Sequence, residues 1–451
     1  MLKSRRIQPA KYVVLGFLFI ILVGSILLST PLATNSHKSV GFLDALFTAT
    51  SAVCVTGLVV VDTATTWSIF GRGVIMTLIQ IGGLGFMSIA TLLPLILNKK
   101  IDLKDRLILK EQLNQNKLHG IVMLLIRVFK LTLIIEITGA IVLAFKFVPM
   151  FGLTKGIGYA VFHSVSAFCN AGFDLLGSKY GEFSSLIGIN DSYFVLMTIS
   201  ILIILGGIGF PVMINLVNHR LTKERFSLNT KIVLITTAAL LIVGTILFFA
   251  LEYTNVDSIG NKGFFQKILN SFFQSTTTRT AGFSSLDFTK FREQTLFMMM
   301  ILMFIGASPA STGGGIKTVT FAILIMNMHA TIKDNSEVNI YGRRISEQTI
   351  KKALAIFMIA MIFFVLGTLI LVTFEPEFDL IASAFECASA IATVGCSIGG
   401  SQNLSIIGKL LISLYMFAGR VGMITMFISL SRKTFSNTSN IRHPEENVLI
   451  G

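Results

Sequence analysis

Four strings of eight residues, each ending in glycine, decide how this sequence of 451 residues is organised. The intervals between their final glycines are 115, 110 and 113 residues, and a phenylalanine stands ten positions before each of these glycines. Self-similarity at a fixed period is the mark of a repeated structural unit. We therefore expect one unit to be written four times. The four glycine strings are TSAVCVTG (Thr50–Gly57), VSAFCNAG (Val165–Gly172), STTTRTAG (Ser275–Gly282) and ASAIATVG (Ala388–Gly395).

The sequence around the glycine strings has the composition of a membrane protein. Hydrophobic residues make up 53% of it and charged residues only 13%, whereas a soluble domain carries roughly a quarter charged residues. A soluble enzyme or a secreted disulfide scaffold is therefore disfavoured. A helix needs about 20 mostly apolar residues to cross a bilayer. Eight stretches meet that requirement: 12–30, 71–97, 120–148, 192–217, 231–252, 292–325, 353–373 and 405–430.

A shorter apolar stretch lies between the members of each pair of spans and leads into a glycine string. About 11 residues of helix rise roughly 16 Å, which is half the thickness of a bilayer. Such a helix can enter the membrane and turn back, but it cannot cross. The sequence thus predicts an all-α integral membrane protein with eight transmembrane helices and four re-entrant helices. The re-entrant stretches are 41–50, 158–168, 265–276 and 379–390.

The net charge of +14 comes from 37 Lys and Arg residues against 23 Asp and Glu residues. Basic and aromatic residues do not interleave as single-stranded nucleic acid requires, so no nucleic-acid partner is expected. Positive charge favours the cytoplasmic side of a membrane, which places both termini in the cytoplasm and lets the re-entrant helices enter from outside. The segments 1–11, 98–130, 217–232, 329–352 and 431–451 hold 24 of the 37 basic residues.

Four re-entrant helices arranged around an axis would surround one narrow passage. Non-helical backbone at membrane depth is tolerated only where protein or water meets its polar groups. A ring of carbonyl oxygens lining a water-filled pore meets that condition and can replace the hydration shell of a cation, as in potassium channel filters. Glycine permits the backbone dihedrals that turn carbonyls inward. The strings therefore predict a central pore for a cation.

The second span of each pair carries a further glycine, at Gly82, Gly206, Gly306 and Gly419. In the third pair the sequence reads ILMFIGASPASTGGGIKTVT from Ile301 to Thr320. Proline removes a helix hydrogen bond, and each glycine weakens a helix by about 1 kcal/mol, so a break is predicted here. A simple kink with close helix packing is the alternative. For the strings GGLGFM and GGIGFP around Gly82 and Gly206, close helix packing is the preferred interpretation.

These residues resemble the Trk, Ktr and HKT superfamily of potassium transporters, whose subunits carry four covalently linked M1-P-M2 units similar to those of potassium channels. The resemblance covers nearly the whole chain and implies repeats at 1–97, 98–217, 218–328 and 329–430, with a cytoplasmic tail at 431–451. It implies potassium binding by the last three residues of each glycine string. These are Val55, Thr56, Gly57, Asn170, Ala171, Gly172, Thr280, Ala281, Gly282, Thr393, Val394 and Gly395.

The resemblance also implies a subtype and a gate. Gly57 stands where family members that pass sodium carry serine, and no extra helices precede residue 12, so the chain is most similar to the eight-helix Ktr type. In the family, the broken inner helix forms an intramembrane loop that obstructs the pore, and an arginine in the fourth unit acts as a barrier and anchors that loop. The corresponding residues are Gly306, Ala307, Ser308, Pro309, Ala310, Ser311, Thr312, Gly313, Gly314, Gly315, Lys317 and Arg420.

One cation beside the strings needs a separate explanation. Arg279 lies three residues before Gly282 and would repel a cation in the pore, so we expect it to point behind the string and to pair with Glu386. The four cysteines near the strings have irregular spacing, and we interpret them as small packing residues rather than metal ligands.

The leading functional hypothesis is potassium uptake through a gated, channel-like pore in the cell membrane of a bacterium. A sodium-coupled symporter with the same fold is the alternative. The sequence offers it no clear second ion site, because Glu136, the notable acid within a span, could equally lie near the cytoplasmic part of its helix. An intramembrane enzyme is a remote third hypothesis. The Ktr resemblance implies a homodimer on a cytoplasmic ring of RCK-type nucleotide-binding subunits, with the nucleotide on that partner and no cofactor in this chain. Basic segments would contact that ring or anionic lipid.

Overall fold

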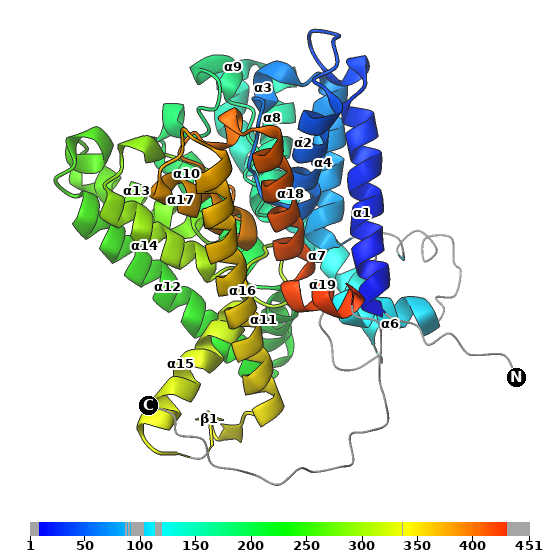
Figure 1. Ribbon diagram of the computed structural model, residues 1–451, viewed down its shortest axis with the longest axis vertical. Coiled ribbons are helices and arrows are strands. Elements are labelled where there is room, and N and C mark those ends of the chain that lie inside the picture. Colours follow the sequence, from blue (N-terminus) through cyan, green and yellow to red (C-terminus); the bar gives the residue numbers. More distant parts are fainter. Residues whose placement is uncertain are drawn as a thin grey trace, which may run out of the picture.

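The computed structural model describes residues 9–85, 88, 91, 103–112, 120–335 and 337–430, and all structural statements below concern these residues. Three predicted segments lie wholly or partly outside them: the inner end of the span 71–97, residues 98–102 and 113–119 of the cytoplasmic segment 98–130, and the tail 431–451. The described chain is helical apart from one short hairpin, and most of its helices run side by side along the long axis of the molecule (Figure 1).

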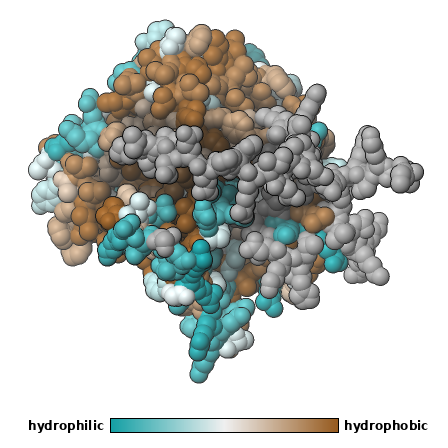
Figure 2. All heavy atoms as spheres, turned by 60° about the horizontal axis from the view of Figure 1, so that its bottom comes forward, coloured by the Kyte–Doolittle hydropathy of each residue, from teal (hydrophilic) through white to brown (hydrophobic). Residues whose placement is uncertain are grey.

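Four helices are long and apolar enough to cross a membrane, or five spans if a bent pair is counted as one. Their outward faces carry large apolar side chains, such as Phe145 with 73% of its surface exposed. Such faces suit lipid rather than water. Figure 2 shows hydrophobic residues over the flank, while hydrophilic residues gather toward the end that is lowest in Figure 1. The four helices are α1 (Pro9–Leu28), α7 (Ile121–Phe151), α12 (Leu228–Glu252) and α16 (Glu347–Phe374).

A short helix lies over each stretch predicted to be re-entrant. Each ends three to five residues before the final glycine of its string, and its C-terminal half is almost entirely buried. The helices have 13 to 16 residues and so begin or end a little outside the predicted stretches. They are α2 (Phe42–Cys54), α8 (Leu153–Phe168), α13 (Phe264–Thr277) and α17 (Leu380–Ala392).

In three of the four pairs the second span begins with a serine cap, whereas the third begins after Arg292 without a side-chain cap. Ser68 Oγ accepts a hydrogen bond from Gly71 N, Ser192 Oγ from Val195 N, and Ser405 Oγ from Gly408 N. Serine at this position satisfies one of the free N–H groups of the first helical turn. The helices that begin the four second spans are α4 (Ile69–Leu84), α10 (Tyr193–Gly207), α14 (Glu293–Phe304) and α18 (Ile406–Val421).

Every one of these second spans is interrupted, including the third, where the sequence predicted a break. Gly85, Gly209 and Gly422 have φ values of +84°, +92° and +91°, a region that interrupts a right-handed helix and that glycine adopts readily. Close packing explains Gly82, Gly83 and Gly206, where an added Cβ atom would collide with a neighbouring residue. The last glycine of each GGLG and GGIG string also caps a helix. The continuations are α11 (Phe210–Thr222), at 99° to α10, α15 (Thr318–Ile332) and α19 (Met423–Leu430).

The helices pack in a closed circle. Each long helix packs against the short helix that follows it in the chain, and each second span packs against the next short helix: α4 on α8, α10 on α13, and α14 on α17. The contact of α18 with α2 closes the circle by joining the last span to the first short helix. This arrangement brings the four glycine strings toward one centre.

The remaining elements lie at the two ends of the molecule. At the upper end in Figure 1 are α3 (Thr63–Thr66) and α9 (Gly177–Tyr180), and at the lower end is the antiparallel hairpin of β1 (Asn339–Ile340) and β2 (Arg343–Arg344). Helix α6 (Leu103–Gln112) packs on α1. The other short turns are η1 (Pro31–Ala33), η2 (Ile187–Ile189), η3 (Val256–Gly260), η4 (Phe288–Lys290) and η5 (Ser401–Asn403).

Candidate functional site

The final glycines of the four strings form a ring. Each faces the carbonyl oxygen of the residue that precedes the next glycine, so that a Cβ atom added to Gly172 would meet the Ala281 oxygen at 2.8 Å. Four carbonyl oxygens therefore stand between neighbouring glycines, and any larger residue would collide with them. The facing pairs are Gly57 with Ala171, Gly172 with Ala281, Gly282 with Val394, and Gly395 with Thr56.

The residue two positions before each final glycine has a left-handed backbone. Its φ is +56° at Val55, +58° at Asn170, +61° at Thr280 and +51° at Thr393. β-branched residues rarely adopt this conformation, which costs on the order of 1–3 kcal/mol and persists where the surrounding structure imposes it. The strings were expected to need unusual dihedrals at glycine, and the structure shows that three of them also hold a strained β-branched residue before it. In the second string this residue is Asn170, a type that adopts the left-handed region more readily.

Hydrogen bonds from the short helices fix the strings from behind. Ser51 Oγ accepts from Gly57 N at 3.0 Å, and Ser389 Oγ accepts from Gly395 N at 3.0 Å. In the second string, Ser166 Oγ donates to the carbonyl oxygen of Phe173 at 2.7 Å. The backbone N–H groups turn toward the short helices, which leaves the carbonyl oxygens to face the ring.

A cavity of about 330 Å³ opens on one side of the ring, and we call it the acidic cavity. Its lining includes all four final glycines and the acids Asp62, Asp174, Glu182 and Asp287, with no Lys or Arg among its described residues. Burial raises the pKa of the Asp174 carboxyl to about 7; a hydrogen bond from the Leu176 N–H opposes this rise, and the nearby Asp62 adds to it.

The loop 305–317, which joins α14 to α15, covers the other side of the ring; we call it the third-break loop. Its ends meet in a bridge between Ile305 and Ile316. Its glycines leave no space against two strings: a Cβ atom on Gly313 would collide with the side chain of Thr280, and one on Gly314 with that of Thr393. The predicted break is therefore confirmed, and the loop lies directly against the strings.

The third-break loop is also bonded to the second string and to the bend between α10 and α11. Thr312 Oγ1 lies 3.2 Å from Asn170 Oδ1 and donates to the Phe168 carbonyl oxygen at 3.1 Å. Ser308 N donates to the carbonyl oxygen of Gly207 at 3.0 Å. The bend between α10 and α11 thus lies against the loop and supplies groups that hold it.

Arg420 ties the third-break loop to the first span pair. Its guanidinium donates hydrogen bonds to the carbonyl oxygens of Thr312 and Gly82, and to that of Gly83 at 3.1 Å. Lys317 holds the loop from within, because its ammonium donates to the carbonyl oxygens of Gly313 at 2.7 Å and Gly314 at 3.3 Å.

Both cations line a second cavity of about 310 Å³, which we call the basic cavity. The third-break loop contributes Pro309, Ala310 and Ser311 to its wall, and no Asp or Glu occurs among its described lining residues. The gating residues named from the sequence are thus gathered beneath the ring, on the side opposite the acidic cavity. The sequence analysis missed the acids of that cavity, although three of them follow a final glycine by two to five residues.

The predicted ion pair between Arg279 and Glu386 does not form. The Glu386 carboxylate instead accepts hydrogen bonds from Ser397 Oγ at 2.5 Å and Ser401 Oγ at 2.6 Å. Arg279 is 5% exposed and lines neither cavity, so it points behind its string as expected. None of the described residues forms a hydrogen bond with Nε or Nη2 of Arg279. The pairing was wrong because hydroxyl groups that follow the fourth string lie closer to Glu386.

Glu136 lies at the depth of the strings rather than at a membrane surface. It is 6% exposed within α7, its carboxylate accepts from Gln80 Nε2 at 3.1 Å, and Cys169 Sγ lies 3.8 Å away. The four cysteines are free and buried. No group of His, Cys, Asp and Glu in the described part of the chain has the geometry of a metal site.

Comparison with known proteins agrees with this geometry. The family model of TrkH, described as cation transport protein, matches residues 12–440. The potassium/sodium uptake protein NtpJ of Enterococcus hirae is 41% identical over 99% of this chain and 98% of its own length. The Ktr system potassium uptake protein B of Bacillus subtilis is 39% identical over 100% and 98%, and that of Vibrio alginolyticus is 37% identical over 100% and 96%.

The fold is also found among solved structures. The crystal structure of the potassium transporter TrkH from Vibrio parahaemolyticus superposes with a TM-score of 0.73, covering 96% of this chain and 87% of that one at 17% identity. The resemblance to the superfamily is thereby confirmed, as is the expectation of a transporter rather than an enzyme. The chain belongs to the TrkH family of cation transport proteins.

Proposed function

We propose that this chain takes up potassium across the cell membrane through the ring of carbonyl oxygens at the four glycine strings. The observation that carries the proposal is the closed ring itself, which lies between the acidic and the basic cavity. A ring of backbone carbonyls can replace the hydration shell of a dehydrated cation. The relatives NtpJ and Ktr protein B bear names that specify potassium uptake.

The proposed architecture consists of four M1-P-M2 repeats with eight transmembrane spans. In each repeat a long helix, a short re-entrant helix and an interrupted second span follow one another, and the closed circle of helix packing supports this division. The ends of the repeats are those given by the sequence, at residues 97, 217, 328 and 430. The last three residues of each string would bind the ion; the first of these twelve residues is Val55 and the last is Gly395.

The third-break loop is the proposed gate. It rests against the second, third and fourth strings, while Arg420 fills the space between it and the first span pair. An ion leaving the ring would meet this loop and two positive charges. Conduction therefore requires the loop to move and the bonds of Arg420 and Lys317 to break, as the family resemblance implies.

The acidic cavity would face the outside and the hairpin of β1 and β2 the cytoplasm. Lys and Arg favour the cytoplasmic side, and the hairpin carries Arg343 and Arg344 on the end that bears the hydrophilic residues in Figure 2. Since relatives are named as components of a Ktr system, we propose a bacterial membrane subunit. It would form a homodimer on an RCK-type ring that binds the nucleotide, with no cofactor of its own.

A sodium-coupled symporter remains the second candidate because Glu136 is a buried carboxyl at membrane depth. The carboxyl has polar partners in Gln80 and Cys169 but no ion pair among the described residues. Sodium stimulation of rubidium uptake into proteoliposomes that the variant Glu136→Gln abolishes would favour this candidate. Uptake that does not depend on sodium would favour the uncoupled pore.

The deciding experiment is radiotracer uptake in a cell that lacks its own potassium transport. The wild type is expected to restore potassium uptake, and Gly57→Ser is expected to lose discrimination against sodium because its Cβ atom displaces the Ala171 carbonyl oxygen, which would lie 2.6 Å away. Gly41→Ala is the control, because Gly41 also has a positive φ but has open space around it. Absence of uptake by the wild type would contradict the proposal.

A further inference from the structure

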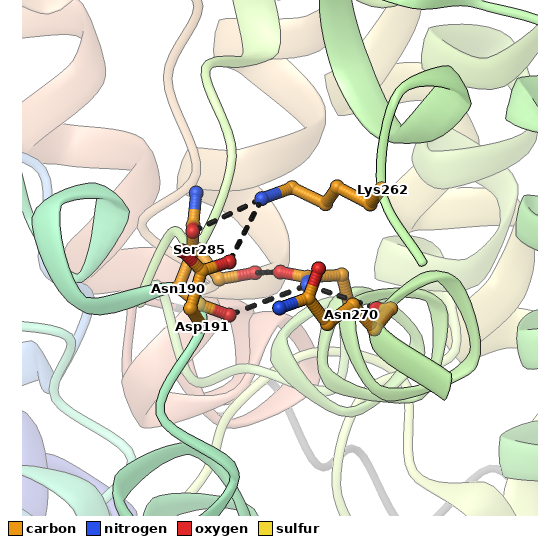
Figure 3. A network of polar contacts seen from close by, with 6 residues as sticks. Asn190, Asp191, Lys262, Asn270 and Ser285 are labelled. Atoms are coloured by element: carbon orange, nitrogen blue, oxygen red, sulfur yellow. Dashed lines mark hydrogen bonds and ion pairs between the residues drawn. The ribbon is translucent and has the colours of Figure 1, made fainter. Parts of the chain in front are cut away.

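A chain of polar side chains runs behind the third glycine string toward the surface (Figure 3). At its outer end, Lys262 Nζ donates to Asn190 Oδ1 at 3.0 Å and to Asp191 Oδ1 at 3.3 Å. Asn270 Nδ2, on the short helix α13, donates to the carbonyl oxygen of Asn190 at 3.4 Å. The chain therefore begins in the loop before α10 and enters the interior through α13.

At its inner end the chain reaches Ser285, three residues after Gly282. Ser285 Oγ donates to Asn270 Oδ1 at 2.8 Å and accepts from Gln274 Nε2 at 3.2 Å. All three side chains are fully buried. Removing one partner of a buried hydrogen bond leaves the other unsatisfied at a cost well above the net value of the bond. The inner end of the chain is therefore held firmly.

The chain completes a set of bonds along the segment that leaves the third string. Thr277 Oγ1 donates to the carbonyl oxygen of Phe283 at 2.6 Å, and Leu186 N donates to that of Ser284 at 2.8 Å. With Ser285, three consecutive residues are bonded, two of them to α13 and one to the loop before α10. These bonds tie the segment both to α13 and to the loop before α10.

The other strings are held differently at the same position. After the second string, Leu175 N donates to Nε2 of His163 at 3.3 Å. After the fourth, Glu386 accepts from Ser397 and Ser401 and is also bonded by the backbone of Ile398. The third string is instead followed by a serine bonded to two neutral side chains of its short helix, Asn270 and Gln274.

We propose that Asn270, Gln274 and Ser285 are positioning residues that set the carbonyl spacing of the third string, and with it the discrimination between potassium and sodium. The inference rests on the proposed function. The strained residue Thr280 and the carbonyl of Ala281 lie between two fixed points, α13 and Ser285. If Ser285 is released, the string relaxes from its strained backbone, and its carbonyls can approach the smaller sodium ion. The pore still conducts, but it selects less.

The test compares Ser285→Ala with Ser285→Thr in proteoliposomes, using radioactive rubidium uptake and its inhibition by sodium. In S285A, we expect the sodium concentration that halves uptake to fall about tenfold, equivalent to about 1.4 kcal/mol. S285T keeps the hydroxyl and should retain the wild-type value. The matched control is Ser258→Ala, because Ser258 is also buried and donates to Glu252 at 2.5 Å, but its bonding partners lie outside the glycine strings. It should leave the value unchanged.

Unchanged discrimination in S285A, with thermal stability lowered as in S258A, overturns the inference while the proposed function stands. If S285A does not reach the membrane, the same sodium inhibition of rubidium uptake is measured in Lys262→Met, which changes the outer end of the chain. A shift of about threefold in the same direction, or about 0.6 kcal/mol, supports the inference, and an unchanged value overturns it. Wild-type protein that takes up no rubidium would instead contradict the proposed function, so the two failures are distinguishable.

Discussion

The two sides of the glycine ring differ in charge and in access. On one side, the acidic cavity contains four carboxyl groups and reaches all four final glycines. On the other side, the third-break loop rests against the strings, and Lys317 and Arg420 line the basic cavity. The comparison shows that the four similar strings form the ring. The third and fourth second spans depart from this similarity, and they provide the third-break loop and Arg420.

The ring itself separates the two sides, and distorting it by substitution should change rubidium uptake more than any other variant below. In Gly395→Ala, the added Cβ atom collides with the Thr56 carbonyl oxygen. The left-handed backbone adds roughly 1–2 kcal/mol for a non-glycine residue. We expect rubidium uptake to fall by about tenfold or more, since 1.4 kcal/mol corresponds to tenfold. Gly41→Ala shares the positive φ without the collision, and equal losses in both variants would contradict the role of the ring.

Removing Arg420 from the basic side should raise uptake, which is the opposite of the effect expected in the ring. Arg420→Ala removes both a positive charge and the hydrogen bonds that join Thr312 to Gly82. We expect uptake to rise by about fivefold, or roughly 1 kcal/mol, measured at equal protein density. Arg292→Ala is the control, because Arg292 also donates to a backbone carbonyl, that of Leu251, but lines neither cavity. Unchanged uptake in R420A would show that the arginine is no barrier.

A smaller increase is expected from Lys317→Met. The substitution keeps an unbranched side chain, one atom shorter, but removes the charge and the two bonds to Gly313 and Gly314. The predicted rise in uptake is about twofold, or roughly 0.4 kcal/mol. Lys267→Met provides the matched loss of a buried lysine bonded to a carbonyl oxygen, that of Tyr253. A decrease in K317M uptake would mean that Lys317 supports conduction rather than closure.

The last prediction, an effect no larger than that expected for K317M, concerns the acidic side and its pH dependence. Since burial raises the pKa of Asp174 to about 7, this carboxyl is charged above that pH and neutral below it. Lowering the external pH through 7 should therefore weaken the apparent affinity for rubidium by about twofold, or roughly 0.4 kcal/mol. Asp174→Asn should show the low affinity at every pH. Asp257→Asn, which lies outside both cavities, should behave as the wild type, and a pH dependence that persists in D174N would refute the assignment.

The parts of the fold that repeat in the sequence could be predicted from it. The strings located all four short helices and the ring, because hydrophobic length and a recurrent glycine are local signals that appear four times. The break at Pro309 was visible because proline and three glycines fall together. The family membership followed from the same residues.

Other features depend on contacts between distant residues and were not visible. Gly85, Gly209 and Gly422 lie in apolar stretches that read as continuous spans. The close approach of Gly209 to the Pro309 carbonyl oxygen of the third-break loop could not be read from the sequence. The spacing of the three glycines, three residues after Gly82, Gly206 and Gly419, was an available signal. The partners of Glu386 could not be ranked from the sequence, since Ser397, Ser401 and Arg279 are all near the strings.

The closing contact between α18 and α2 has a consequence for synthesis of the protein. The ring is incomplete until Gly395 reaches Thr56, which was made 339 residues earlier. A nascent chain that has inserted its first, second and third strings still lacks one side of the ring. The proposed permeation path would therefore be completed late in translation, when the third-break loop, which lies earlier in the chain than the fourth string, has already been made.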